Sequence, residues 1–457
     1  MNLLVKDKCF YKKMAVIAIP ISLQSMITIG VNMTDTVMVG KLGETSLSAT
    51  ALANQFVNIY QICCMGIAMG ASVLTSRFWG MQDITSLKKT ITLMLRLCIV
   101  LAVLFMLPTI LIPQLLMRMY TNDSAVIAQG VQYFKWMVYC YFLQGMTMTC
   151  TIVLRSVGQV NFPLFTSIGS FFVNILFNYM FIFGKLGVPR MEVEGAGVGT
   201  LIARVFEFSL ICGYFLFVDR KIGYRLKDLR MECNSLIKDY VSISIPVFVS
   251  DSLLALGTSA VAMVMGRVGT GFVSANSITV VTQQLTTVII QGICHASCIM
   301  TGHTLGHGER EKAQQQAWTF LILGLVVGIL GGGLIKVLSR PIIGLYNITP
   351  ETAQIAGELM DAIAFIVIFQ SMNSILTKGV LRGGGDTKFL MVADIIFLWA
   401  ASLPLGILAG LVWHLDAFWI YVFLKIDQIC KSIWCVFRLR SGKWIKTFSK
   451  EKMNHAQ

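Results

Sequence analysis

A single aspartate stands out within a long apolar segment near the start of the chain. Asp35 lies about fifteen residues beyond Pro20, in an apolar run at 14–39. A carboxylate inside a membrane-spanning helix costs about 2.5–3.5 kcal/mol on insertion scales, so it needs a partner or a water-filled cavity. No Lys or Arg lies within one or two helical turns of it, since Lys41 already follows the run. Such a carboxylate is suited to bind a proton, a sodium ion or a cationic substrate. The alternative is a structural aspartate held by hydrogen bonds.

Two asparagines further along the chain offer ligands for the same chemistry. Asn174 and Asn178 are four residues apart in an apolar run, so both side chains project from one face of the predicted helix. Their carbonyl oxygens are hard ligands of the type that sodium prefers, by analogy with other hard cations. Each could instead be a polar contact that holds neighbouring helices together. The residues alone leave both interpretations open.

The segments that carry these residues are typical of a membrane protein. The hydrophobic fraction is 56%, the charged fraction is 13% and the mean hydropathy is +0.73. A soluble domain carries about 25% charged residues, and a bilayer core about 30 Å thick requires roughly twenty apolar residues per helix. Twelve runs of this kind predict an all-α polytopic membrane protein with twelve transmembrane helices. The runs span approximately 14–39, 49–75, 90–112, 131–153, 163–183, 195–218, 240–265, 274–300, 316–337, 353–377, 389–411 and 417–437.

Lys and Arg residues are distributed unevenly between the loops on the two sides of the membrane. With the N-terminus placed in the cytoplasm, the cytoplasmic loops and tails receive 25 of them and the opposite loops receive 8. Cytoplasmic loops of membrane proteins carry the excess of Lys and Arg, so both termini are predicted inside, with the protein in the plasma membrane. The net charge of +14 is therefore a topology signal, and we expect no nucleic-acid partner.

The chain repeats itself at an offset of 226 residues. The same offset relates Asn58 to Gln284, so a polar side chain recurs at equivalent places and both are candidate cavity residues. Ordinary packing is the alternative for this pair. The residues that recur are Pro20 and Pro246, Gly40 and Gly266, Gly43 and Gly269, Gly66 and Gly292, Thr75 and Thr301, Gly80 and Gly306, and Tyr120 and Tyr346.

The duplication predicts two lobes of six helices each. We place the N-terminal lobe at 1–218, a cytoplasmic linker at 219–239, the C-terminal lobe at 240–440 and a basic cytoplasmic tail at 441–457. Six helices separate equivalent positions, so the two bundles have the same orientation and are related by a pseudo-twofold axis along the membrane normal. We expect the substrate path between them, as in alternating access.

Several segments resemble the multidrug and toxic compound extrusion (MATE) family. The resemblance covers most of the chain, and the order and duplication of its motifs are more specific than any one of them. It implies a twelve-helix fold of two lobes that exports organic cations in exchange for sodium ions or protons. The motifs are IPISLQSMITIGVNMTDTVMVGKLG at 19–43, LRSVGQVNFP at 154–163, NILFNYMFIFGKLGVP at 174–189, GAGVGTLIAR at 195–204 and LRGGGDTK at 381–388.

The resemblance also implies roles for individual residues. An aspartate at the position of Asp35 is a cation site in the family, and Thr200 matches a family threonine beside that site. In part of the family the position of Asn178 is an aspartate followed by proline, whereas here Tyr179 follows an asparagine. Asp35 is therefore expected to be the main anion. We predict a cation site formed by Asp35, Asn174, Asn178 and Thr200.

The second half departs from the family pattern. Some members carry a glutamate in the seventh helix at the position of Leu254; here Asp251 lies nearly one turn earlier. Some also carry an aspartate in the tenth helix, at the position of Ser371, which is flanked here by Gln370 and Asn373. We predict Asp251, Gln370 and Asn373 as further cavity residues. For Asp251 the alternative is a partner for a nearby basic group.

Other polar residues are assigned no part in transport. Asp394 lies near the end of a run, where interfacial solvation is expected, and Arg382 is expected in a cytoplasmic turn. A cluster of cysteine and histidine matches no standard zinc spacing, so we predict no metal and no cofactor. That cluster consists of Cys294, His295 and Cys298.

These observations favour a secondary active exporter over other classes. We expect antiport of small organic cations against H⁺ or Na⁺, by a monomer embedded in the lipid bilayer. The alternative is a flippase of lipid-linked saccharide precursors with the same two-lobe architecture. A flippase would need several Arg or Lys residues in its cavity to hold a pyrophosphate, and none is evident. The sequence contains no HExxH, GxSxG or Walker pattern, so we do not expect an enzyme.

Overall fold

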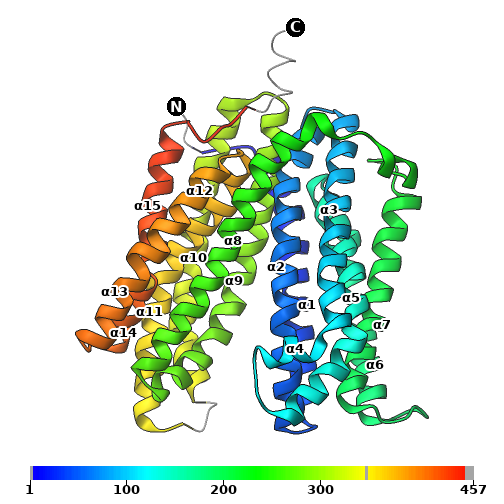
Figure 1. Ribbon diagram of the computed structural model, residues 1–457. Helices are drawn as coiled ribbons and strands as arrows, with labels where there is room; N and C mark the ends of the chain where they lie inside the picture. Colours follow the sequence, from blue (N-terminus) through cyan, green and yellow to red (C-terminus); the bar gives the residue numbers. More distant parts are fainter. Residues whose placement is uncertain (1–3, 345–347, 448–457) are drawn as a thin grey trace. The chain divides into compact units, whose positions relative to one another are not determined.

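The structure is a computed structural model that describes residues 4–344 and 348–447 (Figure 1). Within these ranges the chain forms helices and loops and no β-strand. The helices of the first half are α1 (Lys8–Gly40), α2 (Glu44–Gly80), α3 (Ile84–Leu111), α4 (Pro113–Arg118), α5 (Ser124–Ser156), α6 (Asn161–Phe183), α7 (Glu192–Gly213), η1 (Tyr214–Val218) and η2 (Leu226–Arg230). Those of the second half are α8 (Asn234–Val268), α9 (Thr270–Gly306), α10 (Arg310–Ile343), α11 (Pro350–Ser374), η3 (Ile375–Leu381), α12 (Thr387–Asp394), η4 (Ile395–Ser402), α13 (Leu403–Ile407), η5 (Leu408–Val412), α14 (Ala417–Leu424) and α15 (Ile426–Arg440).

The predicted membrane spans are confirmed, with one exception. Eleven helices of the described residues are long and apolar enough to cross a bilayer. Most extend beyond the predicted runs, because a helix continues into the polar headgroup region outside the roughly 30 Å hydrocarbon core. The run at 389–411 is one span, Thr387–Val412, although π-helical turns divide it into α12, η4, α13 and η5.

The twelfth predicted run, at 417–437, is helical but is interrupted, and it is not among the eleven spans. Helix α14 ends at Leu424 and α15 begins at Ile426, because the backbone of Lys425 leaves the helical conformation with φ −121° and ψ 15°. The segment also carries Asp427 and Lys431, so it is less apolar than the other eleven. The structure explains these charges by ion pairs, which are described below.

The chain divides into two compact units, and the division differs from the predicted lobes. The N-terminal unit comprises Leu23–Ser244, whereas the C-terminal unit combines residues 1–22 with residues 245–457. Helices α1 and α8 therefore each contribute to both units, and they change unit within a few residues of Pro20 and Pro246. Proline removes one backbone hydrogen bond and bends a helix, so the segments before and after it can follow different neighbours.

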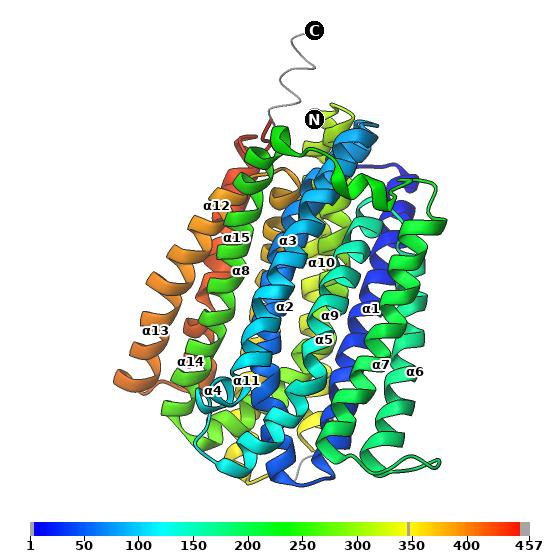
Figure 2. The same ribbon diagram turned by 45° about the vertical axis from the view of Figure 1, so that its right-hand side comes forward.

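Small residues let the helices of the N-terminal unit approach closely. Helices α6 and α7 run side by side in both views (Figures 1 and 2). A Cβ atom on Gly195 would lie 2.6 Å from the carbonyl carbon of Phe181, and one on Gly199 would lie 2.1 Å from Oδ1 of Asn178. Glycines four residues apart on one face are a common device for close packing of membrane helices. They place Asn178 directly against α7.

The predicted linker is packed against the N-terminal unit. Tyr224 is fully buried, and its hydroxyl lies 2.9 Å from Oγ1 of Thr92 on α3. Nζ of Lys88, also on α3, forms an ion pair of 2.9 Å with Asp228. The linker therefore packs against α3, and the charged composition of the linker did not predict this contact.

The beginning of the predicted basic tail is packed into the C-terminal unit. Trp444 is fully buried, and its Nε1 donates a hydrogen bond of 2.7 Å to Oε1 of Gln314 on α10. A Cβ atom on Gly384 would lie 2.4 Å from the Trp444 ring. The middle glycine of the LRGGGDTK motif therefore makes room for a tryptophan sixty residues later in the chain.

Candidate functional site

Asp35, Asn174 and Asn178 lie together inside the N-terminal unit. Nδ2 of Asn178 donates hydrogen bonds to Oδ1 of Asp35, at 2.6 Å, and to Oδ1 of Asn174, at 3.2 Å. Both asparagines are buried, with 3% and 1% of their surface exposed. The structure thus joins the helix α1 carboxylate to the two amides that share one face of α6.

The carbonyl oxygen of Asn178 is an acceptor without a donor. Its Oδ1 atom is buried and makes no hydrogen bond, while the amide nitrogen of the same side chain serves Asp35 and Asn174. More than nine in ten buried polar groups in proteins have a partner, so an exception needs an explanation. A water molecule, a proton donor or a cation beside Asp35 would supply the missing partner.

Asp35 opens onto a cavity of about 380 Å³. The lining includes the predicted residues Asn58, Asn174 and Thr200, and it is otherwise a mixture of amides, hydroxyls and apolar groups. A polar wall around one carboxylate provides the solvated surroundings that a charge inside a membrane span requires. The further polar lining residues are Thr28, Asn32, Thr36, Thr50, Asn54, Gln61, Tyr133, Gln144, Ser167 and Ser170.

Two charged residues of this cavity were missed by the sequence analysis. Arg204 and Glu207 of α7 line the cavity, and Nη1 of Arg204 lies 2.8 Å from Oε2 of Glu207. They follow Thr200 at the i+4 and i+7 positions, so the three residues share one helical face. That spacing, with an arginine inside an apolar run, is a signal that could have revealed them.

The surroundings of Asp35 are therefore less free of basic groups than its neighbours along α1 suggested. Arg204 comes from another helix and attracts the carboxylate electrostatically. Its hydrogen-bonded ion pair, however, is with Glu207 rather than with Asp35. Asp35 keeps its amide partner and its place on the cavity wall.

The predicted residues of the second half do not join this cavity. The residues that line it all belong to the N-terminal unit, whereas Asp251 pairs with Arg382 in the C-terminal unit. Nη2 of Arg382 lies 3.0 Å from Oδ1 of Asp251, and Nη1 lies 3.4 Å from Oδ2. For Asp251 this geometry matches the alternative of a partner for a basic group. Arg382 directly follows η3 and precedes the turn at Gly384 and Gly385, and the structure adds a buried partner, because Asp251 of α8 binds it and 4% of it is exposed.

The remaining predicted cavity residues belong to other hydrogen bonds or to the surface. Gln370 accepts a hydrogen bond of 3.0 Å from Nε2 of Gln283, and Nδ2 of Asn373 donates one of 2.7 Å to Gln428. The side chain of Gln284 is exposed. Of this weaker set, Asn58 is the one that lines the cavity around Asp35.

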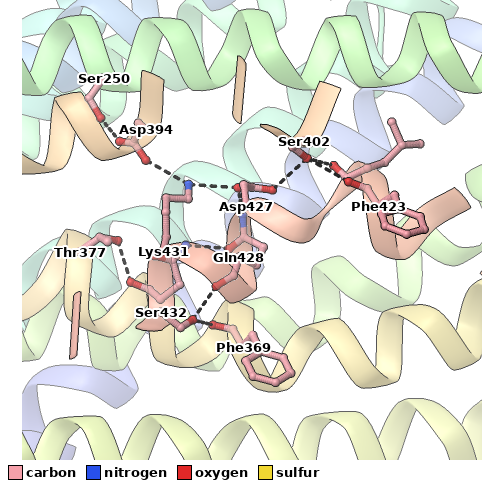
Figure 3. Close-up of polar contacts among 12 residues, drawn as sticks. Ser250, Phe369, Thr377, Asp394, Ser402, Phe423, Asp427, Gln428, Lys431 and Ser432 are labelled. Carbon is pink, nitrogen blue, oxygen red and sulfur yellow. Dashed lines mark hydrogen bonds and ion pairs between the residues drawn. The ribbon is translucent and has the colours of Figure 1, made fainter. Parts of the chain in front are cut away.

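A buried ion triad lies in the C-terminal unit (Figure 3). Nζ of Lys431 lies 3.0 Å from Oδ1 of Asp394 and 3.1 Å from Oδ2 of Asp427, and all three side chains are less than a tenth exposed. Ser250 donates a hydrogen bond to Asp394, and Ser402 donates one of 3.4 Å to Asp427. Helices α8, α12 and α15 are thereby tied together by charges in the core.

The expectation of interfacial solvation for Asp394 is wrong. Its side chain is buried, because Lys431 from α15 supplies the counter-charge that water would otherwise provide. A lysine at i+4 from Asp427, within an apolar run, was the available signal for an internal ion pair. The count of Lys and Arg residues in the loops included neither Asp427 nor Lys431, because both lie within a predicted span.

The cysteine and histidine cluster does not form a metal site in the described ranges, where no group of three or more His, Cys, Asp or Glu residues could hold a metal ion. Cys294 and Cys298 are buried in α9, and Sγ of Cys294 donates a hydrogen bond of 3.4 Å to the carbonyl oxygen of Ser374. These side chains pack as small apolar groups between α9 and the end of α11.

Comparison with known sequences finds one family. Its sequence model, MatE, matches residues 20–180 and 246–429. The two matches begin 226 residues apart (246 minus 20), which agrees with the internal duplication. The chain is 24% identical over 441 residues to a probable multidrug resistance protein NorM of Thermotoga maritima. The alignment covers 95% of this chain and 93% of the relative. It is also 24% identical to an uncharacterized transporter, YisQ, of Bacillus subtilis, with 90% of each covered.

Solved structures resemble the whole chain as well. The bent form of the Vibrio cholerae MATE transporter VcmN superposes on this chain with a TM-score of 0.85 at 17% identity. The superposition covers 96% of this chain and 99% of the VcmN chain. An outward-facing multidrug resistance MATE transporter of the MOP superfamily gives a TM-score of 0.83 at 19% identity, with 95% and 97% covered. At such identities the likeness shows the fold, and it confirms the predicted twelve-helix, two-lobe architecture.

Proposed function

Because this chain belongs to the MatE family of transporters, we propose that it exports organic cations by antiport against protons or sodium ions. The multidrug resistance names of its relatives support export of drug-like compounds. Inward movement of a cation down the membrane potential supplies about 2.3 kcal/mol per charge per 100 mV, which is sufficient to drive extrusion. The protein itself is then a multi-pass transporter of the plasma membrane that acts as a monomer, with both termini in the cytoplasm.

The observation that carries this proposal is the group formed by Asp35 and Asn174 on the cavity wall and by Asn178, which is hydrogen-bonded to both. Asp35 is the anion that the coupling ion and the substrate both require. Asn174, which also lines the cavity, adds a neutral oxygen ligand from α6, and Asn178 links the two side chains by its amide nitrogen. Because two cations cannot share one carboxylate favourably, binding of the ion releases the substrate, and this exclusion couples their movements.

The same oxygen atoms suit either coupling ion. A proton would reside on Asp35, whose carboxylate accepts the amide hydrogen bond of Asn178. A sodium ion would find hard oxygen ligands in Asp35, Asn174, Asn178 and Thr200. Imposing pH and sodium gradients separately distinguishes the two.

The flippase alternative receives less support from the cavity. A pyrophosphate requires several free basic groups. Arg204 is the basic residue among those that line the cavity, and Glu207 already binds it. The cavity suits a cation better than an anion.

The test is accumulation of a fluorescent organic cation inside inverted membrane vesicles that contain the protein, because the cytoplasmic face of such vesicles points outward. Replacement of Asp35 by Asn should abolish ion-driven export, because the neutral amide has no differential affinity for the cation in the two states. The protein should still insert, since an amide costs no more than a carboxylate in the span.

Asp361→Asn is the matched control for this test. That carboxylate is exposed, pairs with Lys336 and is not among the residues that line the cavity, so its loss should leave export unchanged. Full ion-driven export by Asp35→Asn at equal expression would rule out Asp35 as the coupling site.

A further inference from the structure

The charges of the cavity around Asp35 add up to one negative unit. Three of its lining residues are charged, namely Asp35, Arg204 and Glu207. The guanidinium of Arg204 is held on Glu207 at 2.8 Å, which leaves Asp35 as the carboxylate without a counter-ion. The other lining residues are neutral amides, hydroxyls, a phenol, a thioether and apolar groups.

Glu207 holds Arg204 on a wall of the same cavity that Asp35 lines from α1. The two residues lie on the cavity face of α7, and their side chains are 29% and 13% exposed. Arg204 and Asp35 attract each other across the cavity. Because an arginine side chain is long and flexible, its ion pair with Glu207 decides whether Asp35 remains available.

We propose that Arg204 is a resident cation that restricts the cavity to organic monocations, and that Glu207 keeps this cation away from Asp35. This inference rests on the proposed export of organic cations and specifies its substrate class. A monocation takes the single free carboxylate. A dication would bring a second charge into the cavity for which no counter-charge remains, which is unfavourable.

Two single substitutions change the cavity charge in opposite directions. Arg204→Gln leaves two free carboxylates and so favours a dication. Glu207→Gln releases Arg204, whose guanidinium then neutralises Asp35 and competes with every cationic substrate. A unit charge about 12 Å away, at an effective dielectric constant of about 20, changes binding about tenfold. We expect effects of this size or larger.

The double variant restores the original balance. With Arg204→Gln and Glu207→Gln together, Asp35 is again the one free carboxylate and no internal cation competes with it. We expect monocation binding within about threefold of the wild-type value, because the two charge changes compensate rather than add. A purely structural role of the pair would also restore stability in the double variant, but it would not raise the dication-to-monocation ratio in Arg204→Gln.

The experiment compares four proteins: the wild type, both single variants and the double variant. Export and binding of the monocation tetraphenylphosphonium and of the dication methyl viologen are measured in vesicles and by calorimetry on purified protein. Thermal unfolding of each variant identifies any that is misfolded. The expected result is a dication-to-monocation ratio raised about tenfold in Arg204→Gln and monocation binding reduced about tenfold in Glu207→Gln.

An unchanged ratio in folded Arg204→Gln, or no recovery in the folded double variant, overturns the inference. If the wild type exports neither compound, the proposed function itself fails. If the wild type exports the monocation and the ratio does not move, only the assignment of Arg204 fails. The compensating double variant keeps the outcome decisive when a single variant is unstable.

Discussion

Asp35 and Lys431 are two charges buried within helices, and the protein treats them differently. Asp35 faces a cavity and accepts one hydrogen bond from the amide of Asn178, so its charge remains available to a bound ligand. Lys431 is enclosed by Asp394 and Asp427, with 2% of its side chain exposed. A fully enclosed ion group contributes to structure, whereas a half-enclosed carboxylate can exchange its partner.

Replacement of Lys431 by Met should strongly destabilise the C-terminal unit. Two carboxylates would remain 3 Å or so from an apolar group, and removal of one partner from a buried ion pair costs about 3–5 kcal/mol. Thermal unfolding in detergent, followed by size-exclusion chromatography, measures the loss.

Two comparisons make this prediction specific. Lys336→Met removes an exposed partner of Asp361 and should cost about 0–1 kcal/mol. Combining Lys431→Met with Asp394→Asn and Asp427→Asn should regain most of the stability, because no uncompensated charge remains. A triad variant as unstable as Lys431→Met alone would mean that packing, rather than charge, explains the loss.

At the scale of helices, the cation site depends on the glycines of α7. Gly199 occupies the place where α7 meets Asn178, and Gly195 lets the backbone of α6 approach one turn earlier. Asn178, a residue of the proposed cation site, is therefore positioned by residues that have no side chain. The next residue of the same helix, Thr200, lines the cavity.

Gly199→Ala should damage the site without unfolding the protein. The new methyl group would lie 2.1 Å from Oδ1 and 2.8 Å from the backbone nitrogen of Asn178, so both the amide and the backbone of α6 must shift relative to Asp35. Overpacking of this kind costs about 1–3 kcal/mol. We expect ion-driven export to fall about tenfold when one hydrogen bond to the carboxylate, worth roughly 1.5 kcal/mol, is lost.

Gly213→Ala is the control on the same helix. A Cβ atom there meets nothing within 4 Å, so the change should leave export unaltered. It should stabilise α7 by up to about 1 kcal/mol, the difference in helix propensity between glycine and alanine. Equal losses of export in the two variants would show that Gly199 has no special relation to Asn178.

At the scale of the whole chain, the duplication organises both the fold and the division into units. The family matches begin at residues 20 and 246, and α1 and α8 change unit next to the prolines at those positions. Equivalent helices therefore behave equivalently, although the two halves carry different charges. The N-terminal unit has an open carboxylate, and the C-terminal unit has paired ones.

Both termini should lie in the cytoplasm, because the Lys and Arg residues concentrate in the loops on that side. Fusion of green fluorescent protein, which becomes fluorescent only inside, to either end should give fluorescent cells. Fusion of a phosphatase that is active only outside should give no activity. Active phosphatase at either end would reverse the proposed orientation.

The sequence by itself determined eleven of the membrane spans and the duplication, and it singled out Asp35 as a carboxylate within an apolar run. Each of these depends on local composition or on a repeated pattern: a run of apolar residues inserts whatever surrounds it, and a carboxylate within such a run is costly wherever the helix packs. The pair Asn174 and Asn178 could likewise be placed on one face of a helix by spacing alone.

Only the tertiary structure decided which charges meet. Arg204 reaches the cavity of Asp35 from another helix, Asp251 meets Arg382 across 131 residues, and Lys431 meets Asp394 across 37. A helix that is apolar on nearly all faces does not reveal its rotation or its neighbours. In lipid these are set by close packing at small residues and by polar contacts between helices, which no single stretch of sequence contains.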